Sequence, residues 1–552
     1  MCMCVASVPF AAPAPVTVPA PANASVRQYE TRSRQLVFPM GIEVYIPEDD
    51  MVRFFAMEYE TLDYTDLYRT YYGSLYDPGP GRPPTDPKLL FQICAFAYAN
   101  DLYSSRKIEE ACLKRIDFIW LLNGEPAPDH SVIANFRSGK CKEAIEGLFY
   151  QYVRRLARIG ATNYKEGIFD GTKIESVANK YTFVWRKSVE KNLAKLIEKV
   201  KAVFDRLGID RDVTKDSLRS VVRNKQYKMA DLRIKMVHGS GRRKSQLQRD
   251  YEELSSILEK WEEYEGHLRT MGPDRNSYSK TDPDATFHRM KDDHMRNGQL
   301  KPSYNLQICV NSEFITGLRV FADRNDVNTL EPFVNTLIEK HGQPYEVVVA
   351  DAGYESLANY RFLDNLGIDS FIKPTVYEFM KTKKFKKQIG RRENMAYDEA
   401  GDYYICADQR RLVFVAEHTY ISKSSIEQTN RVYRCENCEG CPCRQECCKS
   451  KDVNKPKEIE VNFEFIAYRE VSLANITSEY GVKLRINRSI QVEGVFGIMK
   501  WDHHFRRFLC KGNDKVMSEL HLIGMGYNLR KLYRKTMDDR LGVHLFKVKK
   551  TA

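Results

Sequence analysis

Residues 346–354 read EVVVADAGY, and this stretch decides the fold. Its three valines and alanine are typical of a strand that is covered on both faces, and Gly353 indicates a turn directly afterwards. Asp351 stands where the strand ends. In open α/β sheets, the carboxyl ends of the strands border the crevice in which ligands bind. The stretch therefore predicts an α/β fold with a carboxylate at its binding edge.

A second segment has the same design much earlier in the chain. Within GIFDGT, Ile168 and Phe169 form a short apolar run, Asp170 follows them, and Gly171 comes next. This order again indicates a buried strand followed by a turn. Both acids have a plain alternative role, because an aspartate before a glycine also caps turns.

A third acid lies on a predicted helix near the carboxyl end. In RSIQVEGVFGIMK, residues 488–500, apolar side chains recur at the spacing of one helix face, and Asn487 is available as the N-cap. Glu493 and Lys500 are seven residues apart and therefore share one side of that helix. We expect the carboxylate to face a metal and the lysine a phosphate. A solvated surface acid is the plain alternative for Glu493.

Together the three acids predict a metal site for phosphodiester chemistry on DNA. A pair of divalent cations needs several hard oxygen ligands, and acids from separate segments supply them without a dedicated cage. Asp170, Asp351 and Glu493 are far apart in the chain, so only a folded domain brings them together. We expect Mg²⁺ to be the bound metal, with Mn²⁺ as a substitute.

Four stretches carry a resemblance to a known family: DGTKIESVAN at 170–179, KPSYNLQ at 301–307, VVADAGY at 348–354 and NRSIQVEGVFGIMK at 487–500. In this order they resemble the DDE-type transposases of bacterial insertion sequences. The resemblance implies a ribonuclease-H-like core, a five-stranded mixed sheet with helices on its faces. It also implies an enzyme that cuts and joins DNA at terminal inverted repeats, inserts into target DNA and acts as a homodimer on that DNA.

The resemblance assigns the three acids to the catalytic triad of the family: Asp170 on the first core strand, Asp351 at the end of the fourth, and Glu493 on a later helix. The family's lysine seven residues after the glutamate is matched by Lys500. Many relatives carry a tyrosine and an arginine before the glutamate, where this chain has other residues. Arg485 and Arg488 are the nearby substitutes, and we expect both to contact DNA.

Charge supports an anionic partner. The chain has 86 Lys and Arg against 74 Asp and Glu, a net charge of +12, and basic residues gather in runs. Arg506 and Arg507 in HHFRRF follow the predicted helix and are expected to contact DNA, with a solvated loop as the alternative. In the helical amino-terminal region the candidate phosphate contacts are Arg106, Lys107, Arg137 and Lys140.

Pattern and composition divide the chain into five segments. A Pro- and Ala-rich start predicts a disordered tail, helical periodicity follows it, and the two core parts are separated by a segment rich in Lys and Cys. Within the core, two long apolar stripes predict a helical hairpin as an insertion. The boundaries are a tail at 1–40, a helical DNA-end-binding domain at 41–160, core at 161–374 with the hairpin at 186–285, a basic, Cys-rich insertion at 375–475, and the Glu493 helix with further helices at 476–552.

Six of the 14 cysteines fall within YRCENCEGCPCRQECCK. Overlapping C-x₂-C spacings suit tetrahedral thiolate coordination of zinc, and a cytosolic setting disfavours disulfides. We expect a structural Zn²⁺ on Cys435, Cys438, Cys441 and Cys447. Replacement of any of them by Cys443, Cys448 or the upstream Cys406 stays open, as do an iron–sulfur cluster and metal-free thiols.

The absence of an apolar run of 18 residues excludes a membrane span in the sequence, so we expect a cytoplasmic protein that associates with the nucleoid through DNA. Three other functions remain open: a catalytically inactive, transposase-derived DNA-binding protein, a nuclease acting on other nucleic acids, and a zinc-dependent interaction protein. Metal-dependent cutting at specific DNA ends distinguishes the transposase from all three.

Overall fold

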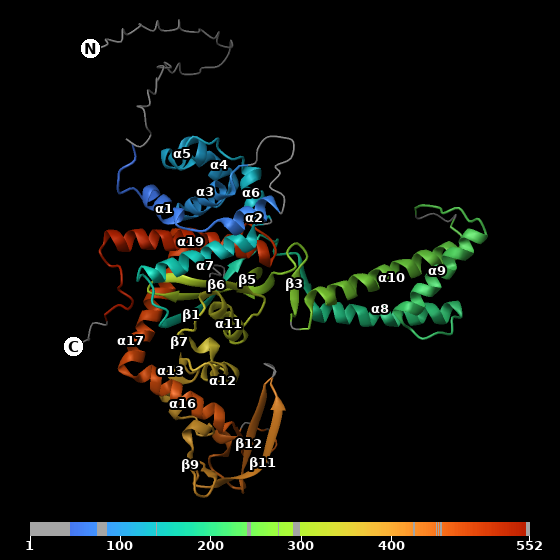
Figure 1. Cartoon of the computed structure of the whole chain (residues 1–552). Helices are drawn as coiled ribbons and strands as arrows, with labels where there is room; N and C mark the ends of the chain where they lie inside the picture. Colours follow the sequence, from blue (N-terminus) through green and yellow to red (C-terminus); the bar gives the residue numbers. More distant parts are fainter. Residues whose placement is uncertain are drawn as a thin grey trace, which may run out of the picture.

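The computed structural model describes residues 45–73, 85–139, 141–239, 244–273, 275–290, 298–422, 426–448, 450, 452 and 455–547. The predicted tail at 1–40 and the candidate contact Lys140 lie outside these residues. Figure 1 shows a helical layer above a central sheet, a second sheet below it, and a long helical arm that projects to one side. In the described part of the chain, every helix is too short or too polar to cross a lipid bilayer.

The central sheet is mixed, as expected. β5 is antiparallel to β1, β6 and β4 are antiparallel to β5, and β7 and β8 continue parallel to β1. The main order is β6-β5-β1-β7-β8, and β4 is a sixth strand that pairs only with the start of β5. The prediction of five strands therefore missed one short strand. The bounds are β1 Glu166–Glu175, β4 Thr286–Arg289, β5 Leu300–Asn311, β6 Phe314–Phe321, β7 Val347–Ala350 and β8 Asp369–Ile372.

Helices cover both faces of this sheet. Neighbouring residues of β6 point to opposite sides: Gly317 faces Leu337 of α11, and Leu318 faces α19. A Cβ at Gly524 of α19 would lie 2.6 Å from Leu318 Cδ1, so glycine permits this close approach. The bounds of the covering helices are α11 Leu330–His341, α12 Leu357–Asn365, α16 Phe463–Thr477, α17 Glu479–Arg488, α18 Gly494–Gly497 and α19 Asn513–Met537. Single 3₁₀ turns lie at Val327–Thr329 and Ala352–Tyr354.

The amino-terminal helices pack directly on α19. Asp86 caps α3, whose first residue is Pro87, and almost the whole of this helix is buried. Its side chains belong to the same apolar core as those of the central sheet. The bounds are α1 Met51–Glu60, α2 Thr65–Tyr72, α3 Pro87–Ala99, α4 Ser105–Lys114, α5 Ile116–Leu122, α6 His130–Ser138 and α7 Lys142–Arg158.

The projecting arm has three helices where two were expected: α8 Arg186–Leu207, α9 Lys215–Asp231 and α10 Gln246–Met271. They share a core of their own, in which Val200, Leu218 and Leu254 are fully buried. The expected stripes on α8 and α10 do form this core, and α9 adds a third side. The short strands β2 Phe183–Trp185 and β3 Ser277–Ser279 pair at the base of the arm.

Below the central sheet lies a second, antiparallel sheet of five strands in the order β13-β12-β11-β10-β9. The sequence interpretation did not foresee it. The bounds are β9 Ala396–Asp398, β10 Tyr403–Ile405, β11 Arg411–Ile421, β12 Glu427–Cys435 and β13 Glu458–Val461. The short helices α13 Tyr377–Met380 and α14 Lys383–Lys386 and a 3₁₀ turn at Arg392–Asn394 precede it, and α15 Arg444–Cys447 lies between β12 and β13.

Candidate active site

Asp170 and Asp351 lie side by side on neighbouring strands. β1 and β7 are parallel, with Ile168 opposite Val349, so each acid stands two residues beyond this pair. Equal offsets from a register pair place both side chains on the same face. The buried VVVA run of β7 is covered on both sides, as the sequence predicts, and ends immediately before Asp351.

Asp351 makes the turn contact that the plain interpretation expects, whereas the expected turn after Asp170 is wrong, because β1 continues through Gly171 to Glu175. Asp170 Oδ1 accepts the Gly171 N–H at 2.8 Å, and Asp351 Oδ1 accepts the Gly353 N–H at 2.8 Å. In both cases the backbone bond uses one carboxylate oxygen. The backbone contact and metal binding are therefore compatible. The contact through Oδ1 holds the carboxylate in place, and Oδ2 takes no part in it.

Glu493 lies on a helix that runs without interruption from Glu479 to Asp502. Ser478 is the N-cap of α17 and accepts the Gly481 N–H through its hydroxyl, so the expectation that Asn487 is the N-cap is wrong. Asn487 lies inside the helix and is buried. Two π-helical turns, Ser489–Glu493 and Ile498–Asp502, contain Glu493 and Lys500. Such turns widen a helix locally and occur frequently at functional sites.

Arg488 joins this helix to β1. Its Nη1 donates to Asp170 Oδ2 at 2.9 Å, and its Nη2 lies 3.8 Å from Glu493 Oε1. The Arg488 and Asp170 side chains are about one-fifth exposed, whereas Glu493 is 61% exposed. The planar fork of arginine suits two carboxylates at once. The predicted nearness of Arg488 to the acids thus has a concrete form, a bridge between the first and third of them.

The ligand atoms of the three acids are not drawn into one coordination sphere. Among the described residues, the group that brings three possible metal-ligand atoms within 4.8 Å of one another is Glu109, Asp129 and His130. The donor type nevertheless fits a hard divalent cation, since all three are carboxylates, one on β1, one directly after β7 and one on the helix. Arg488 stands between two of them.

A fourth carboxylate, Asp326, lies beside the pair and was missed in the sequence. Its Oδ1 accepts Asn305 Nδ2 and Gln307 Nε2, both at 2.9 Å, and lies 3.2 Å from Lys173 Nζ. Its Oδ2 is 3.7 Å from the position of a Cβ at Gly353. The site therefore extends to the loop before α11. The signal in the sequence was weak, because Asp326 lies in a polar loop without periodicity.

Tyr354 packs beneath this acidic group. The side chain is buried, and its hydroxyl donates to Gln307 Oε1. Burial raises the pKa of Tyr354 well above its ordinary value, and the negative charges of Asp326, Asp170 and Asp351 add to the effect. These three carboxylates therefore lie near one buried hydroxyl, although they come from distant segments.

Gln307 and Asp326 lie so close to Gly171 that this position has no room for a side chain. A Cβ at this position would overlap Gln307 Nε2 and lie 3.0 Å from Asp326 Oδ1. Because Gln307 is buried and bonded to Tyr354 and Asp326, it has little freedom to move away. The glycine that the sequence suggested as a turn former thus serves mainly to admit Gln307 and Asp326 next to β1.

The other predicted cationic residues near the helix have separate positions. Lys500 Nζ donates to Thr172 Oγ1 at 2.6 Å, two residues along β1 from Asp170. Arg506 is exposed, with its guanidinium carbon 4.1 Å from the centre of the Trp501 ring. Arg507 donates from Nε to the carbonyl of Ser176 at 3.0 Å, so it also holds the end of β1.

Two of the predicted DNA contacts do not face outward. Arg137 is buried, and its Nη1 donates to Tyr98 Oη at 3.0 Å and to the Tyr103 carbonyl at 2.5 Å. The prediction that Arg137 contacts DNA is therefore wrong. Arg485 is half-buried, and its guanidinium carbon lies 5.4 Å from the centre of the Tyr377 ring. By contrast, Arg106 and Lys107 are exposed on α4.

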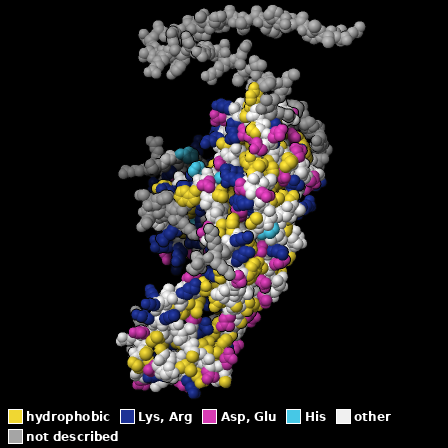
Figure 2. All heavy atoms as spheres, turned by 90° about the vertical axis from the view of Figure 1, so that its left-hand side faces the viewer, with side chains coloured by type: hydrophobic (Ala, Val, Ile, Leu, Met, Phe, Trp, Pro, Cys, Tyr) yellow, Lys and Arg dark blue, Asp and Glu magenta, His cyan; other side chains and the backbone are white. Residues whose placement is uncertain are grey.

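Surface charge is mixed on the face drawn in Figure 2. Over the described residues of that face, Lys and Arg side chains are interspersed with Asp and Glu. A net charge of +12 thus does not appear there as one basic field.

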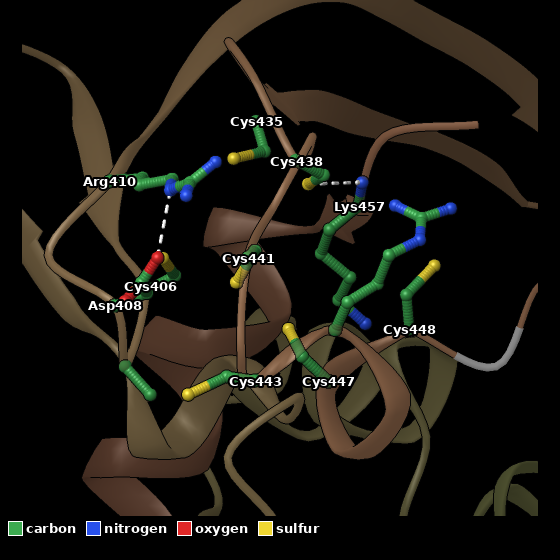
Figure 3. Close-up of a pocket in the computed structure, with 12 residues that line it drawn as sticks. Cys406, Asp408, Arg410, Cys435, Cys438, Cys441, Cys443, Cys447, Cys448 and Lys457 are labelled. Atoms are coloured by element: carbon green, nitrogen blue, oxygen red, sulfur yellow. Dashed lines mark hydrogen bonds and ion pairs between the residues drawn. The ribbon is translucent and has the colours of Figure 1, made fainter. Parts of the chain in front are cut away.

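Seven cysteines line one cavity beside the second sheet (Figure 3): Cys406, Cys435, Cys438, Cys441, Cys443, Cys447 and Cys448. All four predicted zinc ligands are among them. Within the described residues, no three of the sulfur atoms lie within 4.8 Å of one another. The cavity thus contains the four expected thiols and three others, but their sulfur atoms are too far apart to coordinate one ion without moving closer.

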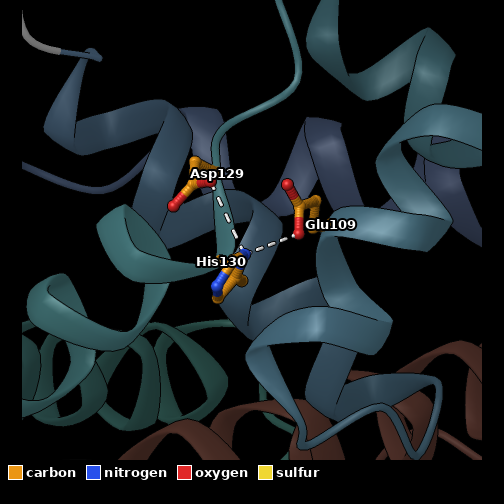
Figure 4. A group of neighbouring side chains, drawn as sticks. All are labelled: Glu109, Asp129 and His130. Carbon is orange, nitrogen blue, oxygen red and sulfur yellow. Dashed lines mark hydrogen bonds and ion pairs between the residues drawn. The ribbon is translucent and has the colours of Figure 1, made fainter.

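The compact ligand set mentioned above is Glu109, Asp129 and His130 (Figure 4). His130 Nδ1 lies 2.9 Å from Glu109 Oε2 and 3.5 Å from Asp129 Oδ2. Asp129 caps α6 by accepting the Ser131 N–H at 2.6 Å. These contacts already account for the group as a helix cap with an ion pair to α4.

The fold and site define an α/β protein with an acidic centre between a strand pair and a helix, and two comparisons with known families identify it further. Residues 41–139 match the family described as Transposase domain (DUF772), and residues 405–533 match the family described as Transposase DDE domain. The chain is therefore similar to DDE transposases over these two segments. No curated protein and no solved structure matches it. The DDE match contains Arg488, Glu493 and Lys500, whereas Asp170 and Asp351 lie outside it.

Proposed function

We propose that the protein cuts DNA at the terminal inverted repeats of an insertion sequence and joins the ends to target DNA. The observation that carries this proposal is the alignment of Asp170 with Asp351 on parallel strands, with Arg488 linking Asp170 to Glu493. The strand order β6-β5-β1-β7-β8 supports the ribonuclease-H-like core that the resemblance implies. The two transposase family matches support the substrate class.

Asp170, Asp351 and Glu493 would hold the divalent metal, with Asp326 beside them. Bound Mg²⁺ or Mn²⁺ would supply Lewis-acid activation of the nucleophile and stabilisation of the leaving oxygen. The protein's own part is positioning. The Gly171 and Gly353 N–H groups fix the two aspartates, and the helix of Glu493 brings cationic side chains against the same strand.

Lys500 and Arg488 are the groups proposed to bind the phosphate being cut. Both contact β1 close to Asp170, so a phosphodiester beside the carboxylates lies within their reach. Their charges oppose the negative charge that develops on the phosphate oxygens. Arg506, exposed and stacked on Trp501, is proposed to contact the flanking DNA backbone.

The other segments of the chain are proposed to have the following roles. Residues 41–160 are proposed to recognise the transposon ends through exposed cations such as Arg106 and Lys107, and two copies of the chain are expected to assemble on the DNA. The core parts at 161–374 and 476–552 would carry out the chemistry. The segment at 375–475 is proposed to hold a structural zinc ion.

The direct test is cleavage of labelled DNA that carries the inverted repeats flanking the coding region, with Mg²⁺ or with EDTA. Metal-dependent nicks at the repeat boundary support the proposal. Specific binding without nicks under Mg²⁺ and Mn²⁺ contradicts it and indicates a DNA-binding derivative. Cutting of RNA–DNA hybrids without preference for the repeats would indicate a nuclease of another kind.

A further inference from the structure

The cysteine cavity offers more thiols than one metal ion needs. Its lining includes seven cysteines, and the free space at its centre is about 10 Å³, roughly the volume occupied by one water-sized sphere. That space suits a single ion rather than a multinuclear cluster. Four thiolates complete the coordination of a structural zinc ion, so three of the seven must have another role.

Packing separates the seven into two groups. Cys406 and Cys435 are buried within the core of the second sheet, at 8% and 2% exposure, and Cys438 and Cys447 pack against the same core. Cys441, Cys443 and Cys448 are not part of that core. Four cysteines from four positions thus converge on one set of apolar neighbours, which include Tyr404, Leu412 and Tyr433.

The backbone explains why Cys406 belongs with the others. It follows β10 directly, and its N–H donates to the Arg410 carbonyl at 2.9 Å in a tight turn into β11. Cys435 ends β12 and pairs with Leu412 of the same β11. The two cysteines therefore stand at the same end of the sheet, on either side of one strand. Figure 3 shows both beside the loop that carries Cys438 and Cys441.

The sulfur of Cys438 is already held by the main chain. It accepts the Lys457 N–H at 3.3 Å, a contact that orients the sulfur. Lys457 and Arg444 also line the cavity and supply positive charge near the thiols. Burial raises the pKa of Cys435 to about 12, and the neighbouring Cys438 thiol acts in the same direction.

Cys441 has a different neighbour. Burial raises the pKa of its thiol, and the Asp408 carboxylate beside it acts in the same direction. Asp408 is itself paired with Arg410 at 2.8 Å. Cys441 thus neighbours the Asp408–Arg410 pair and lies outside the core against which Cys438 and Cys447 pack.

The second sheet also needs a further source of stability. In the described residues its core has eight buried side chains, two of which are Cys406 and Cys435. Cores this small rarely stabilise a domain on their own, and structural metals are one common remedy. A zinc ion at this point would tie the ends of β10 and β12 to α15.

We propose that Cys406, Cys435, Cys438 and Cys447 bind one structural zinc ion and that Cys441, Cys443 and Cys448 do not. This set differs from the sequence prediction at one position, with Cys406, an alternative that the sequence left open, in place of Cys441. Zn–S bonds of about 2.3 Å bring the sulfur atoms to roughly 3.8 Å from one another, so binding contracts the cavity. The proposal refines the zinc assignment made in the proposed function, and it is tested independently of DNA cleavage.

Metal content of the purified full-length protein and of two matched serine variants provides the first test. We expect one zinc per chain in the wild-type protein and in Cys441→Ser, and less than about a tenth of that in Cys406→Ser. Full zinc in Cys406→Ser with loss in Cys441→Ser would overturn the ligand set. Iron with visible absorption, or no zinc after incubation with ZnCl₂ and buffer exchange, would overturn the metal.

A second test uses the wild-type chain and so does not depend on folding of a variant. Five cysteines of the cavity have intermediate exposure: Cys438, Cys441, Cys443, Cys447 and Cys448. During brief alkylation read by peptide mass spectrometry, we expect protection of Cys438 and Cys447 that a zinc chelator removes, and labelling of the other three that the chelator leaves unchanged. Equal labelling of Cys438 and Cys441 before chelation would contradict the proposal. Asp351→Asn should show the wild-type pattern even though it does not cleave DNA.

Discussion

Arg488 donates a hydrogen bond from Nη1 to Asp170 Oδ2 at 2.9 Å, and this contact ties the helix of Glu493 to the first strand of the sheet. The same guanidinium reaches Glu493 from its second nitrogen. Arg488 therefore sets the distance between two acids that are far apart in the sequence. It also brings a permanent positive charge to the point where a phosphate is expected.

Replacing Arg488 tests this role. Arg488→Ala should lower the rate of DNA cleavage by about 100-fold, because one charged donor to the developing phosphate charge is lost. Arg488→Lys should recover little of it, since an ammonium lacks the fork that spans two carboxylates. Cleavage of end DNA under single-turnover conditions measures both. Arg485→Ala is the control on the same helix, and an equal loss in that variant would argue against a specific role for Arg488.

Asp326 is expected to matter as much as a residue of the triad. Asp326→Asn keeps an acceptor for Asn305 and Gln307 but removes the negative charge, so the fold should persist while cleavage falls by about 100-fold. Asp323→Asn, in the same loop, is the matched control and should cleave normally. The assay is cleavage rate against Mg²⁺ concentration, together with thermal unfolding. Cleavage by Asp326→Asn within about threefold of wild type would remove Asp326 from the site.

Gly171→Ala should damage both stability and cleavage. The added methyl group meets Gln307 and Asp326, which gives an overpacking cost of about 1–3 kcal/mol and displaces the acidic group. Gly147→Ala is the control: this residue lies on α7 with open space at its Cβ, and the change should stabilise that helix by up to about 1 kcal/mol. Denaturant unfolding and end cleavage measure the two effects. Unchanged unfolding in Gly171→Ala would show that the packing around β1 is looser than described.

Buried histidines predict that the fold weakens in acid. Burial lowers the pKa of His288 and His341 to about 4 and that of His521 to about 3, against about 6.5 when unfolded. Between these pKa values the unfolded chain binds more protons than the folded protein. The contribution of these histidines to the free energy of unfolding is therefore fully present above about pH 6.5, and it declines as the pH falls, by up to roughly 1.4 kcal/mol per histidine per pH unit. Melting temperatures at pH 7 and pH 5 measure this. His521→Phe should weaken the pH dependence and the exposed His418→Gln should not; identical slopes would refute the assignment.

The local patterns that predicted the centre of the fold were those that depend on burial alone. The valines of β7 are apolar on both faces, so a covered strand was the natural interpretation, and Asp351 follows from where that run ends. The pairing of β5 with β6 was equally accessible, because the turn of Ser312 and Glu313 separates two apolar runs. Register between β1 and β7 was not accessible, since it depends on contacts between distant segments.

The errors have physical reasons too. Arg137 was interpreted from its charge, yet it follows Ile133 and Phe136 on the apolar side of α6, and that spacing was the available signal for burial. Asp326 and Cys406 lie in loops whose partners come from other strands, so periodicity said nothing about them. The sheet β9–β13 was overlooked because its strands alternate irregularly and its cysteines suggested a metal-bound loop.

The most direct test of the central claim compares wild-type protein with Asp351→Asn on labelled inverted-repeat DNA in Mg²⁺. Asparagine keeps the shape and an acceptor for the Gly353 N–H but carries no charge to hold the metal. The account predicts nicks at the repeat boundary with the wild-type protein, and unchanged DNA binding without nicks in the variant. Nicking by Asp351→Asn at the wild-type rate would contradict the account.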